Sequence, residues 1–212
     1  RMKKSMQRFD VEGEITVIPP RDNWVESCAI KSSFLCDARV RLRGPLLYVD
    51  VDAFIHANPW PYLCRYESDV CVYFSPSGEL ISSVILLNDT AGCLSLLRKW
   101  KQEQLKHKEE WDQRVLQRVI EHEENSKARN FFVDRLPPTF CTILNQRRVH
   151  DVSAVYVEQL QASRVSEKKW GFVKSTDGSR RSERISELEN NLNWNETNSN
   201  NIKVRHVKEF RH

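Results

Sequence analysis

The chain has 212 residues, of which 40% are hydrophobic and 29% are charged, and this composition excludes a chain that is disordered throughout. Its longest apolar runs are far shorter than the roughly 20 residues that cross a bilayer, so we expect no membrane span. A net charge of +4 is too small for a dedicated DNA clamp. No secretory signal opens the sequence, and its six cysteines form no CxxC pair. We therefore expect a cytoplasmic protein with reduced cysteines.

Strand and helix patterns alternate along the chain. In chain order, we expect a short strand at 14–18, a helix through 29–35, strands within 45–55 and 70–87, helices from 90 and from 110, and a last strand within 142–156. The two long apolar runs are typical of strands that are buried on both faces, and the helices follow apolar residues spaced three or four apart. This alternation predicts an α/β fold.

Two aspartates directly follow an apolar strand pattern, in the segment LLYVDVDAFI. In an extended strand, Asp50 and Asp52 share one face, with Cα atoms about 6.6 Å apart. Two like charges at the end of an apolar strand are costly to desolvate without a cation, and hard divalent cations prefer carboxylate oxygens. The pattern therefore predicts a metal site that also carries a diphosphate. A turn capped by the aspartates, or their pairing with Arg or Lys, is the alternative.

A Trp-Asp-Gln sequence begins the second long helix. We expect Trp111, Val115 and Val119 to form its buried stripe, so that Asp112 and Gln113 project from its flank. The helix dipole stabilises a carboxylate in the first turn, where Asp112 could orient a sugar hydroxyl or stabilise positive charge at an anomeric carbon. A simple helix N-cap is the alternative for Asp112. The amide of Gln113 suits hydrogen bonding to a polar ligand.

The order of several short segments resembles a known family. In chain order these segments are Asn23-Trp24, Lys31, LLYVDVDAFI, Ser82-Ser83-Val84-Ile85-Leu86, Glu110-Trp-Asp-Gln-Arg114, Leu136-Pro-Pro-Thr-Phe-Cys141 and Gln161-Ala-Ser-Arg164. Together they resemble the nucleotide-diphospho-sugar transferase group of GT-A-type glycosyltransferases, particularly its small bacterial and phage-like members. The resemblance implies a single GT-A-like, Rossmann-type mixed sheet flanked by helices, without the first strand that usually binds the nucleotide base.

The resemblance also implies roles for individual residues. Asp50 and Asp52 would bind Mn²⁺ or Mg²⁺ together with the donor diphosphate, and Asp112 and Gln113 would face the transferred sugar as the catalytic pair. The residues implied around the donor are Trp24, Lys31, Ser82, Ser83, Gln161, Ser163 and Arg164, with the two serines in a small-residue turn. Where related enzymes have a histidine as a further metal or phosphate ligand, this chain has Gln159.

We therefore expect residues 1–164 to be an N-terminally incomplete catalytic domain and residues 165–212 to be a polar, weakly ordered tail. The expected function is metal-dependent transfer of a sugar from a nucleoside diphosphate-sugar to a hydroxyl acceptor, which could be a glycan, a small molecule or a modified nucleic acid. A non-catalytic nucleotide-sugar-binding module is the first alternative. A metal-dependent phosphohydrolase is the second, and it would need further clustered acids.

Overall fold

The computed structural model describes residues 1–19, 21, 23–143, 154–160, 177–190 and 202–206. The chain forms two compact units whose segments alternate along the sequence. The first unit consists of Arg1–Thr16, Asp50–Pro59 and Pro138–Arg205, and the second consists of Val17–Val49, Trp60–Pro137 and His206–His212.

A four-stranded sheet forms the centre of the second unit. Its strands, in spatial order, are β2 (Leu46–Val49), β5 (Leu80–Leu87), β4 (Val70–Phe74) and β6 (Val133–Arg135). Strand β5 runs antiparallel to β2 and to β4, whereas β4 and β6 are parallel, so the sheet is mixed. The apolar run at 70–87 is a hairpin, and Gly78, with a φ of +84°, lies in its turn because glycine tolerates this conformation.

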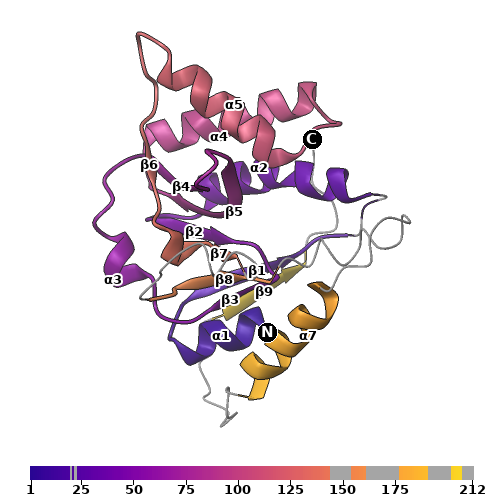
Figure 1. Cartoon of the computed structure of the whole chain (residues 1–212). Coiled ribbons are helices and arrows are strands. Elements are labelled where there is room, and N and C mark those ends of the chain that lie inside the picture. Colours follow the sequence, from indigo (N-terminus) through magenta and orange to yellow (C-terminus); the bar gives the residue numbers. More distant parts are fainter. Residues whose placement is uncertain (20, 22, 144–153, 161–176, 191–201, 207–212) are drawn as a thin grey trace. The chain divides into compact units, whose positions relative to one another are not determined.

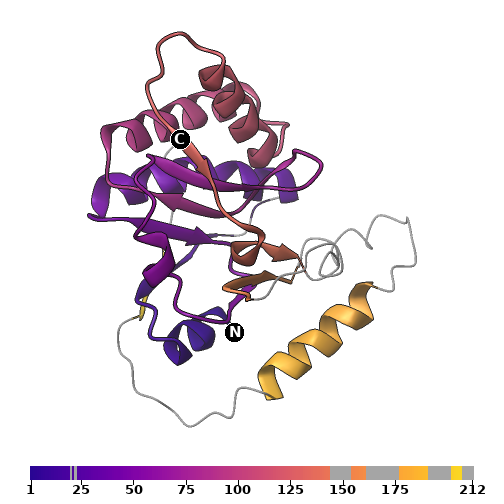
Figure 2. The same ribbon diagram turned by 60° about the vertical axis from the view of Figure 1, so that its left-hand side comes forward.

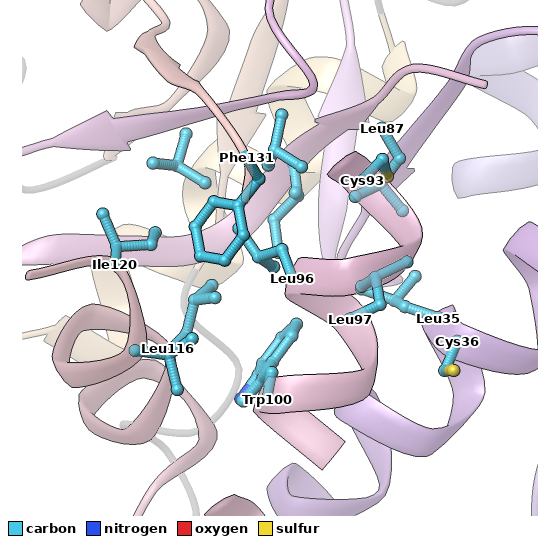
Figure 3. Packing of buried hydrophobic residues seen from close by; sticks show 14 of the residues in the cluster. Leu35, Cys36, Leu87, Cys93, Leu96, Leu97, Trp100, Leu116, Ile120 and Phe131 are labelled. Atoms are coloured by element: carbon cyan, nitrogen blue, oxygen red, sulfur yellow. The ribbon is translucent and has the colours of Figure 1, made fainter. Parts of the chain in front are cut away.

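Three helices cover one face of this sheet (Figures 1 and 2). They are α2 (Trp24–Arg41), α4 (Ala91–Lys106) and α5 (Asp112–Glu124), and the short helix α3 (Trp60–Leu63) precedes β4. Helix α4 begins where the sequence predicts, because the Thr90 side chain accepts a hydrogen bond of 3.0 Å from the Cys93 N–H. Leu35, Leu97, Trp100 and Leu116 converge from the three helices in the core (Figure 3).

The first unit contains two small sheets. One has the order β3 (Ala53–Ile55), β8 (Val157–Gln159) and β7 (Thr142–Ile143), and the other pairs β1 (Gly13–Val17) with β9 (Ile202–His206). Its helices are α1 (Met2–Arg8), α7 (Asp177–Asn190) and a 3₁₀ turn at Pro138–Phe140. Within the described ranges of both units, no helix combines the length and the apolar character needed to cross a membrane.

Helix α7 and strand β9 lie within 165–212, a range for which the sequence predicts weak order. Leu188 of α7 packs against Phe54 and Leu160. The Arg184 guanidinium donates hydrogen bonds of 3.0 and 2.9 Å to the carboxylate of Glu158, which is fully buried. These contacts join α7 to the first unit, which spans both sides of residue 164. Because α7 contains few apolar residues, composition alone does not reveal this packing.

Candidate functional site

An irregularity in β5 positions Ser82. The register between β5 and β4 skips three residues of β5 between Ile81 and Ile85, and such a bulge frees backbone groups from the ladder. Here Lys31 Nζ donates to the Ser82 carbonyl at 3.2 Å, and the Ser82 N–H donates to Oε1 of Gln113 at 3.3 Å. The resemblance implies that Ser82 lies in a turn. That expectation is wrong, because the residue lies within a strand.

Three of the expected site residues meet at this bulge. Lys31 of α2 lies with its Nζ 3.1 Å from Oδ2 of Asp112, at the start of α5. The Ser82 hydroxyl donates to the same carboxylate oxygen at 2.8 Å and accepts from Lys31 Nζ at 3.1 Å. The side chains of Lys31 and Asp112 are only 10% and 5% exposed. An isolated charge is costly to bury. Here each of the three side chains has the other two as partners, so neither charge is isolated.

The helical pattern predicts that Trp111 is buried and that Asp112 projects from the flank of the helix, and the structure shows the opposite. Asp112 is buried, whereas Trp111 is 40% exposed. The N-cap position belongs to Trp111, which makes no side-chain cap bond, so the interpretation of Asp112 as an N-cap is also wrong. The buried stripe of α5 begins at Val115 and includes Val119, as expected. Trp100 Nε1 donates to the Asp112 carbonyl at 3.2 Å, which ties this first turn to α4.

Strand β2 pairs only with the second half of β5. Along the first half of β5, two glutamine side chains of α5 accept hydrogen bonds that a neighbouring strand would otherwise accept. Gln113 and Gln117, one helical turn apart, accept hydrogen bonds from the N–H groups of Ser82 and Leu80 at 3.3 and 3.0 Å. Gln113 Nε2 also donates to Glu79 at 2.7 Å. Gln113 therefore has a structural role in this network. Sequence reasoning missed Gln117 and Glu79, although the i, i+4 spacing of the glutamines was an available signal.

Trp24 and Ser83 also belong to the second unit. Trp24 is the first residue of α2 and lies against Trp111, with ring centroids 5.0 Å apart. Ser83 is half-buried in β5 beside Ser82, so it too lies in the strand and not in a turn. The second unit thus brings Trp24 and Ser83 close to the Lys31–Asp112 network.

Asp50 and Asp52 belong to the first unit and lie in a turn. Strand β2 ends at Val49, and the Ala53 N–H donates to the Asp50 carbonyl at 3.0 Å before β3 begins. The extended conformation that would place both aspartates on one face of a strand is therefore not found, and the separation of about 6.6 Å that depends on it does not apply. Both aspartates are half-buried.

Gln159 lies on β8 of the first unit, where it is 4% exposed. It stands opposite Ala53 in the antiparallel pair of β8 and β3, so its strand is the neighbour of the turn that carries Asp50 and Asp52. Its Nε2 is buried without a hydrogen-bond partner among the described residues. A buried donor of this kind is uncommon and calls for an explanation.

The remaining expected residues, Gln161, Ser163 and Arg164, lie outside the described residues. Across the described ranges, no group of three or more His, Cys, Asp or Glu side chains is placed to hold a metal ion. Asp50 and Asp52 supply two carboxylates in one turn, and their oxygens are of the type that Mn²⁺ and Mg²⁺ prefer. Their chemistry therefore fits the expected cation.

Solved structures of similar fold include glycosyltransferases. One, a glycosyltransferase involved in the glycosylation of the major capsid of PBCV-1, has a TM-score of 0.51 and 13% identity, covering 72% of this chain and 78% of that chain. The apo form of GlyE from Streptococcus pneumoniae TIGR4 has a TM-score of 0.51 and 14% identity, covering 88% of this chain and 59% of that chain. No family model matches the sequence, and no curated protein matches it.

The fold is therefore a mixed α/β fold of the GT-A-like class, as the resemblance implies, and it is similar to the folds of these glycosyltransferases. The described strands form three sheets, however, and not the single sheet that the resemblance implies. This chain spans less than two thirds of the GlyE chain. At these identities the likeness concerns the fold and not the activity, which depends on the residues of the site.

Proposed function

We propose that this protein is a metal-dependent glycosyltransferase, which moves a sugar from a nucleoside diphosphate-sugar to a hydroxyl acceptor. The main support is the meeting of Lys31, Ser82 and Asp112 in one buried network on a GT-A-like fold. Each residue comes from a different segment, and the resemblance to GT-A-type enzymes implies each of them separately. A fully satisfied buried polar network makes the fold more rigid and specifies one arrangement of the core, so this juxtaposition is a specific feature of the fold.

Asp50 and Asp52 are the proposed ligands of Mn²⁺ or Mg²⁺. A cation bound there would neutralise charge on the departing diphosphate. Gln159, whose strand neighbours the turn with both aspartates, has a buried Nε2–H that we assign to an oxygen of the diphosphate. This assignment gives the unpartnered donor an acceptor when the donor substrate is bound.

Asp112 is the proposed catalytic carboxylate. Lys31 and the Ser82 hydroxyl fix its position before the substrate binds, and a charge that is already oriented needs no reorganisation when positive charge develops at the anomeric carbon. Gln113 is held beside it and is the proposed contact to a sugar hydroxyl. The further residues proposed around the donor are Ser83, Gln161, Ser163 and Arg164.

A hydrolysis assay tests this function without knowledge of the acceptor. The protein is incubated with UDP- or GDP-sugars, with and without Mn²⁺, and the release of free sugar and nucleoside diphosphate is measured. Asp50→Asn and Asp52→Asn should abolish the metal-dependent release. Asp37→Asn, which changes an exposed carboxylate on α2, is the matched control and should leave the rate unchanged.

Three other outcomes would contradict this function, each in favour of a different one or of a different mechanism. Metal-dependent binding of a nucleoside diphosphate without turnover, seen as a thermal shift, would make the protein a nucleotide-sugar-binding module. Cleavage of a nucleic acid or of a phosphate ester would make it a phosphohydrolase. Release of sugar that Asp50→Asn and Asp52→Asn leave intact would remove the metal from the proposal.

A further inference from the structure

Two exposed tryptophans form a pair on the second unit. The rings of Trp24 and Trp111 lie 5.0 Å apart, at an interplanar angle of 83°. Trp24 is 41% exposed and Trp111 is 40% exposed, whereas Trp100 in the core of the same unit is fully buried. Apolar residues that are exposed singly are common, whereas exposed apolar side chains that adjoin one another are typical of surfaces that bind other molecules.

The pair lies next to the Lys31–Asp112 network because the same two helices, α2 and α5, position the residues of both. Trp24 and Lys31 are seven residues apart on α2, which places them on one face with a separation of about 10.5 Å along the axis. On α5, Trp111 directly precedes Asp112. The same two helices thus make an aromatic contact, Trp24 with Trp111, and an ionic contact, Lys31 with Asp112.

Polar groups border the two indoles. The Arg114 guanidinium lies 5.2 Å from the centroid of the Trp111 ring. Beside Trp24, the exposed Asn23 amide donates to Glu26 at 2.8 Å. A ligand for this surface therefore needs an apolar face for the indoles and hydroxyl groups at its margin.

A sugar ring in the chair form has these properties, because its axial C–H groups form an apolar face and its hydroxyls lie around the edge. The two indoles are nearly perpendicular, so a flat nucleobase could stack on one of them but not on both. A chair-shaped ring fits between two perpendicular indoles better than a nucleobase does, because it is thicker and also has an apolar face.

We propose that Trp24 and Trp111 bind a pyranose ring of a carbohydrate acceptor. This proposal rests on the proposed glycosyltransferase function and adds the chemical class of the acceptor. It also replaces the expectation that Trp24 contacts the donor. Trp24 and Trp111 act here as binding residues beside the network that holds Asp112, and the bond-forming step itself needs no contribution from them.

The test follows the indole N–H signals of the protein by NMR while maltotriose, cellotriose or chitotriose is added. Replacing single tryptophans with phenylalanine assigns the signals. We expect at least one trisaccharide to shift the signals of Trp24 and Trp111, and Trp24→Ala to weaken its binding about tenfold. Trp24→Phe should retain most of the affinity, because an aromatic face remains. Trp60→Phe, at a half-buried tryptophan on α3, is the control.

The titration contains neither metal nor nucleotide-sugar, so its result does not depend on whether the protein transfers sugars. If no trisaccharide shifts the two signals, the proposal is wrong even if the protein hydrolyses nucleotide-sugars. If UDP or GDP shifts them and the saccharides do not, the indoles bind the donor base instead. Binding that Trp24→Ala and Trp111→Ala both leave unchanged places the saccharide elsewhere and also overturns the proposal.

Discussion

The ammonium of Lys31 lies 3.1 Å from the carboxylate of Asp112, and both side chains are almost completely buried. The Ser82 hydroxyl, 2.8 Å from the same carboxylate oxygen, is the third member of this network. The pair links α2 to the first turn of α5 across an otherwise apolar region. Its removal therefore affects the packing of two helices as well as the proposed chemistry.

Breaking this pair from one side should destabilise the protein strongly. Lys31→Met leaves the Asp112 carboxylate buried without a cation, and we expect the free energy of unfolding to fall by about 3 kcal/mol. Urea denaturation measures the change. The double variant Lys31→Met with Asp112→Leu should recover part of the loss, because neither charge then remains buried. Losses that simply add would show that the two residues do not interact.

Part of this network could be predicted from the sequence and part could not. The order of the short segments pointed to Lys31, Ser82 and Asp112. The inward direction of Asp112 was missed because an apolar stripe counted from Trp111 assigns that tryptophan to the core. The pattern does not reveal that Trp111 is an N-cap residue, and an N-cap side chain does not follow the helical repeat. The buried partner of Asp112, moreover, comes from another helix.

Gln117 should protect the backbone of β5. Gln117→Leu removes the acceptor of the Leu80 N–H, so that donor loses its partner at a partly buried position. We expect amide exchange at Leu80 to speed up and the free energy of unfolding to fall by about 1 kcal/mol. Hydrogen exchange followed by NMR gives both values. Gln102→Leu, at an exposed glutamine of α4, should change neither.

The order of strands and helices could largely be predicted from the sequence, and the exceptions have physical causes. The apolar run at 45–55 contains two strands, because the Asp50–Ala53 hydrogen bond closes a turn within it. Apolar residues on both sides of the aspartates hide this break from a hydropathy pattern. Helix α7 is held by contacts with β8, which is distant in sequence, and its own composition gives no sign of them.

Arg184 should hold α7 in place. Its guanidinium makes two hydrogen bonds to Glu158, and His56 Nε2 also lies 2.8 Å from this carboxylate. Arg184→Leu leaves the buried carboxylate without its permanent cation, and we expect a loss of about 3 kcal/mol. Limited proteolysis should then cut within 177–190 much faster. Arg180→Leu, at an exposed arginine of the same helix, should keep the cleavage rate of the native protein, and equal rates for both variants would contradict this role.

Cys93 should make the protein less stable at alkaline pH. Burial raises the pKa of its thiol to about 12, above the value near 8.5 of an unfolded chain. A group whose pKa is raised by folding stabilises the protein below the unfolded pKa, and this stabilisation is lost as the pH rises toward the folded pKa. Between pH 8.5 and 10.5, we therefore expect Cys93 to lower the free energy of unfolding by about 2 kcal/mol.

Urea denaturation at several pH values measures the slope of the free energy of unfolding against pH. Cys93→Ala should make this slope shallower, whereas Cys64→Ala, at an exposed cysteine, should leave it unchanged. An identical slope in the native protein and in Cys93→Ala would show that the thiol is not buried in this way.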